Sequence, residues 1–173
     1  MTGYIEWGIK KTECKIVENY GKSPGFSGKL MLIGEYKHII DTKKRLSLPA
    51  KFRKEIGRKV IVTRGFENCL VVYPEKVWEA VRGKLEGLPT SQISVRRFNR
   101  IILAGAMEVF LDKLGRILIP DYLKKYAGLK KNVIICGLSN KLEVWDIQKW
   151  ELYRKRAEKE IEKVAQDLPE LGI

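Results

Sequence analysis

The residues of this chain best suited to chemistry form a pattern that occurs twice, an aspartate followed four positions later by an arginine. The first copy is Asp41-Thr42-Lys43-Lys44-Arg45 and the second is Asp112-Lys113-Leu114-Gly115-Arg116. An aspartate at the start of a turn accepts hydrogen bonds from the backbone N–H groups of that turn. An arginine can donate two parallel hydrogen bonds to a phosphate or to the O6 and N7 atoms of guanine. The pattern therefore predicts two structured turns, each carrying a group that can recognise a polyanion.

The charge of the chain indicates the same kind of partner. The sequence has 34 Lys and Arg residues against 21 Asp and Glu residues, and its formal net charge is +13. Of this excess, +9 lies between Met31 and Ala104, while residues 147–173 are balanced. The densest stretch, Lys43–Arg64, contains nine basic residues and a single acid, Glu55. This excess predicts a polyanionic partner such as nucleic acid, although a solvated basic face is the plainer interpretation of the stretch alone.

Each candidate residue in and beside this stretch can be given a role. Arg45 would read bases or hold a phosphate in a bidentate manner. The residues that would neutralise and position phosphates are Lys37, Lys43, Lys44, Lys51 and Arg53. The residues expected to structure the two turns are Asp41, Asp112, Gly115 and Arg116. A surface ion pair with Asp41 remains the alternative for Arg45. The corresponding ion pair with Asp112 is favoured for Arg116, because the second copy lacks a cationic tip.

Other kinds of chemistry find little support in the sequence. The three cysteines show no CxxC spacing, and the single histidine, His38, has no second histidine with which to share a metal. No HExxH, GxSxG or P-loop motif is present, and each repeated aspartate lies beside an arginine. We therefore expect no enzyme activity, metal, cofactor or small-molecule substrate. The longest apolar runs have four to six residues, against ~20 in a membrane helix, so we expect a cytoplasmic protein without a membrane partner.

The repeat extends beyond the two turns and defines the elements that position them. Residues 34–49 align with residues 105–120 at an offset of 71, and the alignment continues at an offset of 72 as far as Trp78 and Trp150. The pattern of each unit predicts the order β-β-α-β-β. The expected strands are Tyr36–Ile40, Arg45–Leu48, Val60–Thr63, Leu70–Tyr73, Met107–Leu111, Arg116–Ile119, Val133–Cys136 and Leu142–Trp145, and the short helices are Pro49–Ile56 and Pro120–Ala127. In each unit the first two strands are expected to form a hairpin whose tip projects towards a duplex groove.

Neither unit can bury both faces of so small a sheet alone. We therefore expect an α+β fold in which two units, residues 34–78 and 105–150, pack as one pseudo-symmetric β-barrel-like body. Residues 79–104 are expected to be a helical connector, and residues 151–173 a C-terminal helix and tail. The helical patterns run over Glu75–Leu85, Ser91–Leu103 and Ile147–Leu168. Residues 1–30 have no counterpart in the repeat, and we interpret them as an N-terminal extension from a misassigned start, with translation beginning at Met31.

The same residues resemble a known family. The runs Gly34–Arg53, Asp112–Pro120 and Tyr126–Leu129 are similar to the MraZ family of bacterial transcriptional regulators, and the likeness covers Met31 to about Tyr153. The resemblance implies two AbrB/SpoVT-like swapped-hairpin units in a double-split β-barrel, and assembly into a ring of several subunits. It also implies a nucleoid-associated protein that binds short G-rich direct repeats in double-stranded DNA, upstream of the family's own operon for cell division and cell-wall synthesis.

One position departs from the family pattern. The family usually has glycine before the first arginine of the repeat, whereas this chain has Lys44. A residue other than glycine is disfavoured at positive φ, so we expect the first turn to differ in shape from the second.

Two further functions stay open at this point. An RNA-binding protein would share the charge but usually offers exposed aromatic residues or an RNP-like motif, which the sequence lacks. An antitoxin-like module that binds a protein partner is the other alternative, because the resemblance implies that antitoxins use the same hairpin fold. A single hairpin offers few contacts with DNA, so several copies presented around a ring would gain affinity through effective concentration.

Overall fold

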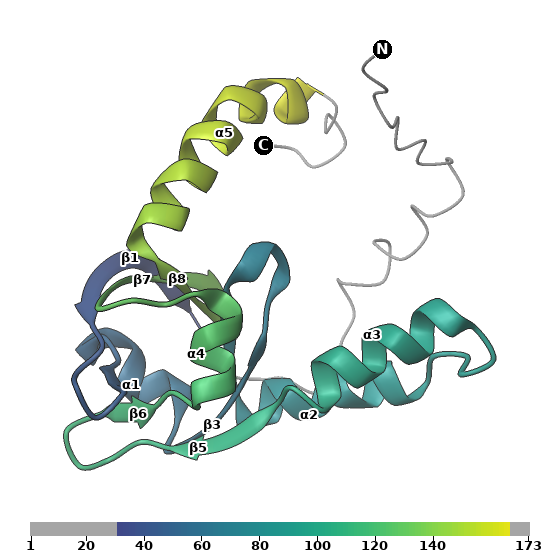
Figure 1. Cartoon of the computed structure of the whole chain (residues 1–173), viewed down its shortest axis with the longest axis horizontal. Helices are drawn as coiled ribbons and strands as arrows, with labels where there is room; N and C mark the ends of the chain where they lie inside the picture. Colours follow the sequence, from purple (N-terminus) through teal and green to yellow (C-terminus); the bar gives the residue numbers. More distant parts are fainter. Residues whose placement is uncertain (1–30, 167–173) are drawn as a thin grey trace.

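The computed structural model describes residues 31–166 of the chain, with side chains described as far as Ile161 (Figure 1). The first unit contains β1 (Leu32–Ile39), β2 (Arg45–Ser47), α1 (Ala50–Ile56), β3 (Lys59–Arg64), the 3-10 turn η2 (Phe66–Asn68) and β4 (Leu70–Pro74). The connector holds α2 (Glu75–Glu86) and α3 (Ile93–Leu103). The second unit contains β5 (Met107–Phe110), β6 (Arg116–Leu118), α4 (Asp121–Ala127), β7 (Asn132–Ser139) and β8 (Leu142–Asp146), and α5 (Ile147–Gln166) follows it. The α+β fold is as predicted, whereas the interpretations of residues 1–30 and of the tail after Gln166 concern residues outside the described part.

Proline and glycine set the limits of the two short helices. Pro49 precedes α1 and Pro120 precedes α4, each with a φ near the value that the pyrrolidine ring imposes. Gly128 follows α4 with φ 62°, and its N–H donates to the carbonyls of Lys124 and Lys125. A left-handed residue at this position satisfies the last carbonyls of a helix. The helices therefore begin and end where the repeat predicts, within one residue.

The strands of the two units are interleaved in one sheet. Six strands pair in the order β1-β7-β8-β4-β3-β5, and β2 and β6 form a separate two-stranded sheet. All of these pairs are antiparallel. The first strand of each unit therefore pairs with the third strand of the other unit, β1 with β7 and β5 with β3. Neither unit has a complete sheet without the other.

The pairing registers define a local two-fold axis. In the small sheet Leu46 lies opposite Ile117, and these two residues are equivalent in the repeat. In the large sheet Val71 lies opposite Glu143, which are again equivalent. An antiparallel pair that crosses at equivalent residues relates the two units by a two-fold rotation. The axis therefore passes between β2 and β6 and between β4 and β8.

The registers also refine the repeat alignment. His38 pairs with Val133, and Val109, the counterpart of His38, pairs with Val60. Val60 and Val133 are therefore equivalent, which is an offset of 73 rather than the predicted 72. Relative to the first unit, the second has two more residues ahead of β7 and one fewer in the turn between β7 and β8.

The predicted hairpins are wrong as strand pairs. Between β1 and β2 the structure contains one isolated bridge, Ile40 to Leu46, and no ladder. β7 pairs with one edge of β1 along all eight of its residues, Leu32 to Ile39, and β1 is the outermost strand of the large sheet. β2 instead pairs with its own counterpart β6. The chain does reverse at Asp41, but the two arms of the reversal enter different sheets, so no free hairpin projects from the body.

One main core lies between the large sheet and the layer of β2, β6, α1 and α4. It receives the inward side chains of the sheet, including Val60, Val62, Val133 and Ile135. From the opposite layer it receives Leu46, Leu48, Phe52, Ile117, Ile119 and Leu123, all of which have no exposed surface. Both turns of the repeat lie next to this layer, because β2 and β6 begin at Arg45 and Arg116. The core therefore holds the two arginine positions at one end of the body.

The longer helices cover the other face of the large sheet and extend from it. Figure 1 shows α2 and α3 running side by side away from the strands, and α5 leaving the body in another direction. Asn99 of α3 donates through Nδ2 to the Leu85 carbonyl at the end of α2 (3.0 Å), and Thr63 of β3 donates to the Ile102 carbonyl (2.8 Å). Within residues 31–166, no helix is long and apolar enough to cross a membrane.

Adjacent residues of β6 offer a matched test of this core. Ile117 is fully buried and Leu118 is 53% exposed. Ile117→Ala should lower the free energy of unfolding by about 2–5 kcal/mol, because it leaves a cavity at the two-fold axis. Leu118→Ala should change it by less than about 1 kcal/mol. Chemical denaturation of both variants measures the difference, and equal losses would contradict the assigned register.

Candidate nucleic-acid interface

The two turns of the repeat share one backbone geometry. In the first, Lys44 N–H donates to the Asp41 carbonyl (2.9 Å) and Asp41 N–H donates to the Arg45 carbonyl (3.0 Å). In the second, Gly115 N–H donates to Asp112 (2.9 Å) and Asp112 N–H donates to Arg116 (2.9 Å). Lys44 has φ 60° and Gly115 has φ 71°. The expectation that Lys44 would change the shape of the first turn is therefore wrong, since the lysine adopts the left-handed conformation that glycine adopts in the second.

Each aspartate binds the arginine of its own turn. Asp41 Oδ1 accepts a bond from the Arg45 backbone N–H (2.8 Å), and Oδ2 accepts from Arg45 Nε and Nη2 (both 2.7 Å). The second turn repeats this arrangement, with Asp112 Oδ1 bound to the Arg116 N–H (2.9 Å) and Oδ2 bound to Nε and Nη2 (both 2.7 Å). The ion pair that the sequence left open for Arg45 is thus present, and so is the one favoured for Arg116. In both, Nη1 has no hydrogen-bond partner among the described residues.

These hydrogen bonds lower the pKa of both carboxyl groups. The backbone N–H of Arg45 is the main cause that lowers the pKa of Asp41. The guanidinium of Arg116 is the main cause that lowers the pKa of Asp112. Both aspartates are therefore ionised at neutral pH, and each fixes one edge of a guanidinium group.

The two turns are joined across the two-fold axis. Leu48 N–H donates to the Gly115 carbonyl (3.0 Å), and Ile119 N–H donates to the Lys44 carbonyl (2.9 Å). Within the small sheet Arg45 lies opposite Leu118 and Arg116 lies opposite Ser47. The Arg45 side chain is 32% exposed and that of Arg116 is 25% exposed. The structure thus brings both Asp–Arg pairs onto one surface formed by both units, which we call the paired-turn surface (residues 41–48 and 112–119).

Arg53 joins the end of β2 to the second turn. Its Nε donates to the Leu48 carbonyl (2.8 Å) and its Nη2 donates to Ser47 Oγ (3.0 Å). Its side chain crosses Gly115 so closely that a Cβ at this glycine would collide with Arg53 Cδ and Nε. Arg53 therefore fixes α1 against the second turn, and a side chain at position 115 would require Arg53 to move.

The remaining candidate lysines differ in their positions. Lys43 is exposed at the tip of the first turn, and Lys51 is exposed on α1. No ion pair to either ammonium group is found among the described residues. Lys37 is exposed on β1, but it alternates with Tyr36 and His38, so it points to the opposite face of the sheet from their side chains. Burial, and then the charge of Arg53, lower the pKa of His38. The structure therefore places Lys43 on the paired-turn surface, Lys51 on the neighbouring helix α1, and Lys37 outside the surface.

Sequence reasoning missed one residue of this surface. Asp121, the first residue of α4, accepts the Lys44 ammonium at 2.6 Å on each of its carboxylate oxygens. The two residues are 77 positions apart and belong to different units. No motif or spacing in the sequence connects them, because their contact depends on how the units exchange strands.

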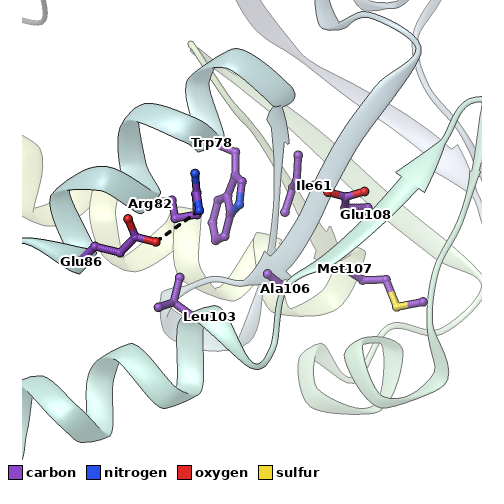
Figure 2. Close-up of a pocket in the computed structure, with 8 residues that line it drawn as sticks. All are labelled: Ile61, Trp78, Arg82, Glu86, Leu103, Ala106, Met107 and Glu108. Carbon is purple, nitrogen blue, oxygen red and sulfur yellow. Dashed lines mark hydrogen bonds and ion pairs between the residues drawn. The ribbon is translucent and has the colours of Figure 1, made fainter.

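A cavity elsewhere in the molecule does not form a comparable site. It has a volume of about 340 Å³ and lies between α2, α3, β3 and β5 (Figure 2). Figure 2 shows Trp78, Leu103 and Met107 among its lining, with Arg82 and Glu86 paired with each other (3.3 Å). Glu108 is paired with Lys59 (3.0 Å). The charged groups of this lining are thus already engaged. Across the described residues, no group of three or more His, Cys, Asp or Glu side chains could hold a metal ion.

Comparisons with known proteins agree on one family. The family model described as "MraZ protein, putative antitoxin-like" matches residues 31–101 and again residues 102–169. The chain is 42% identical over 143 residues to the Transcriptional regulator MraZ of Syntrophomonas wolfei subsp. wolfei, which covers 83% of this chain and all of that protein. It is 46% identical, with the same coverage, to the proteins of that name from Caldicellulosiruptor saccharolyticus and Acetivibrio thermocellus.

The lowered carboxyl pKa values predict a pH dependence of stability. Each aspartate binds its proton less readily in the folded state, so its ion pair stabilises the fold above the unfolded pKa of about 3.9. This contribution is lost as the pH falls through the lower folded value. Asp41→Asn keeps an oxygen for the Arg45 N–H but loses the charge. It should lower the melting temperature at pH 7 and make the melting temperature fall less steeply below pH 4.

Thermal unfolding between pH 2 and pH 7 measures this effect. Glu79→Gln on α2 is the matched control, since Glu79 is exposed and no ion pair of its carboxylate is found in the described part. The control should leave the profile unchanged. A profile for Asp41→Asn that runs parallel to the wild type down to pH 2 would contradict a stabilising ion pair.

Proposed function

Because this chain belongs to the MraZ family, we propose that it is a transcriptional regulator that binds double-stranded DNA and is not an enzyme. The observation that carries this proposal is the paired-turn surface, on which two oriented guanidinium groups lie beside exposed lysines. DNA recognition needs both kinds of group, since cations supply affinity for phosphate and arginine forks supply contacts with bases.

We propose that Arg45 is the base-reading residue or a bidentate phosphate clamp. Asp41 holds the Nε and Nη2 edge of its guanidinium. The outer edge, formed by Nη1 and the second N–H of Nη2, is left for a partner. Two parallel donors on this edge match the O6 and N7 acceptors of guanine. Because Asp41 already fixes the side chain, less conformational entropy is lost when DNA binds.

We propose that the first turn is the reading copy and the second is its scaffold. The Asp–Arg geometry is the same in both turns, so the difference must come from the residues around it. At the tip position the first turn exposes Lys43 and the second exposes Leu114 (61% exposed), while the preceding position holds Thr42 in the first turn and the exposed Lys113 in the second. Lys43 and Lys51 would contact phosphates on either side of Arg45, while Asp112, Gly115 and Arg116 maintain the second turn.

The wider assembly is also part of the proposal. We propose that the strands form a double-split β-barrel of two AbrB/SpoVT-like units, residues 34–78 and 105–150, with residues 79–104 as the connector. Several such chains would form a ring that binds direct repeats upstream of the protein's own cell-division and cell-wall operon, in the cytoplasm and associated with the nucleoid. α3 supports subunit contact, since it buries none of its residues and exposes Ile93, Phe98 and Ile101.

A second candidate is an antitoxin-like module that binds a protein partner. The description of the family model contains this term, and the exposed apolar side chains of α3 would suit a protein surface. Co-purification of one protein in fixed stoichiometry, together with the absence of duplex DNA binding, would favour this candidate over the first.

The base-reading role of Arg45 predicts a loss of discrimination. Arg45→Ala should reduce the preference for the region upstream of the protein's gene over a scrambled duplex by about fivefold to 150-fold, since a bidentate contact discriminates by ~1–3 kcal/mol. Arg45→Lys keeps the charge and should lose most of the same preference. Fluorescence anisotropy with both duplexes measures the ratio of dissociation constants.

Two control variants complete this measurement. Arg116→Ala removes an ion pair of the same geometry and should retain the preference. Lys43→Ala should weaken binding to both duplexes alike and lower the slope of log K against log salt by about 0.9. Unchanged discrimination in a folded Arg45→Ala protein would contradict the assignment.

The exposed side chains of α3 predict where subunits meet. Ile101 is 49% exposed, and Ile101→Glu should shift the protein from an oligomer towards a monomer, because a charge would have to be buried. Gln92→Glu adds the same charge at an exposed position before the helix and should leave the assembly intact. Size-exclusion chromatography with light scattering gives the masses, and an unaltered mass for Ile101→Glu would place the contact elsewhere.

A further inference from the structure

The ion pair between Lys44 and Asp121 joins the paired-turn surface to the start of α4. The Lys44 ammonium lies 2.6 Å from both Asp121 carboxylate oxygens. The bond from Ile119 N–H to the Lys44 carbonyl (2.9 Å) brings the two residues together, because Ile119 is only two residues before Asp121. The contact is therefore fixed at the backbone as well as at the side chains.

This ion pair has no counterpart on the other side of the two-fold axis. The residue equivalent to Lys44 is Gly115, and the residue equivalent to Asp121 is Ala50. Arg53 occupies the space over Gly115 instead. The second turn is therefore covered by an added positive charge, whereas the first is covered by a neutral pair. The two turns thus share one backbone geometry but differ in the charged side chains that lie over them.

Both partners are open to solvent. The Lys44 side chain is 46% exposed and that of Asp121 is 74% exposed. A phosphate can therefore approach the ammonium group, but it also approaches the carboxylate. Lys43, the neighbour of Lys44, has no such acid, since no ion pair of its ammonium is found among the described residues. The two adjacent lysines should consequently respond differently to DNA.

We infer that Asp121 competes with DNA phosphate for Lys44 and so lowers the affinity of the paired-turn surface for any duplex. The inference rests on the proposed function. A pair of opposite charges has no net charge and releases no counterion when phosphate approaches, so it adds nothing to the salt dependence of binding. Asp121 removes Lys44 from the charge-driven, sequence-independent part of the affinity and leaves a larger share to Arg45.

A double-mutant cycle tests this competition. The proteins are the wild type, Lys44→Ala, Asp121→Asn and the double variant, each measured against the upstream duplex and a scrambled duplex between 50 and 200 mM salt. Alanine is chosen at position 44 because, unlike glycine, it keeps a Cβ at the positive φ of this turn. The cycle then measures the effect of removing the ammonium group and not the effect of a more flexible backbone.

The effect of Lys44→Ala on the salt slope should depend on whether Asp121 is present. With Asp121 present, Lys44→Ala should leave the salt slope almost unchanged. In the Asp121→Asn background the same replacement should lower the slope by about 0.9, the value for one phosphate contact. Asp121→Asn alone should strengthen binding to both duplexes by about threefold to tenfold at 0.1 M salt, since one lysine is released to neutralise phosphate.

Matched variants guard against two simpler explanations. Glu79→Gln also removes one exposed carboxylate but lies on α2, on the other face of the sheet, and it should strengthen binding much less than Asp121→Asn. Asp121→Ser provides a second uncharged residue that suits a helix start, and it should reproduce the result if Asp121→Asn unfolds the protein. Thermal unfolding of every variant checks that each is folded.

Specific outcomes would overturn the inference. A loss of about 0.9 in slope for Lys44→Ala in both backgrounds would mean that Lys44 contacts phosphate regardless of Asp121. An equal gain from Asp121→Asn with and without Lys44 would mean that Asp121 acts by repulsion alone. If the folded wild type binds neither duplex, the proposed function fails and the inference fails with it, which is distinct from either of the first two results.

Discussion

The exchange of strands between the two units is the constraint on which the rest of the structure depends. β1 needs β7 for its hydrogen bonds and β5 needs β3, so neither unit can complete its sheet alone. Unpaired backbone groups in a buried strand are costly, and the exchange satisfies them. Because β2 forms its ladder with β6, the exchange also brings both Asp–Arg turns to one place. The paired-turn surface is thus a product of the topology and not of either turn.

The exchange of strands between the units also explains why a lysine can occupy the position of a glycine. The carbonyl of Lys44 is held by Ile119 N–H and its N–H by the Asp41 carbonyl, so the left-handed conformation is imposed from both sides. The Lys44 side chain points into space where the Asp121 carboxylate receives it. At Gly115 the same backbone is required, but Arg53 fills the space that a side chain would need. The glycine is therefore needed only in the second turn.

The sequence predicts the elements of this fold much better than their partners. Repeated Pro, Gly and Asp residues mark local events, such as the start of α1 after Pro49 or the turn at Asp41, and these are visible in a single segment. The pairing of β1 with β7 is not visible, because an apolar strand beside a turn fits a hairpin equally well. For the same reason the sequence predicts the Asp41–Arg45 pair, four residues apart, and misses Lys44–Asp121, 77 residues apart. Proximity in the sequence predicts that Lys37 lies with the first turn, but the alternation of β1 points its side chain away.

The size of the paired-turn surface limits how the proposed regulator can achieve affinity. β2 and β6 have three residues each, so one chain can reach few base pairs. Affinity must then come either from more charge on each chain or from more chains on each DNA. More charge strengthens binding to every sequence alike, and the pairing of Lys44 with Asp121 acts against it. More chains multiply the contribution of each Arg45 through effective concentration and preserve discrimination. A surface that neutralises one of its own lysines is therefore consistent with recognition by several copies. In such an assembly each contact is weak, and the number of correctly spaced contacts determines where the assembly binds.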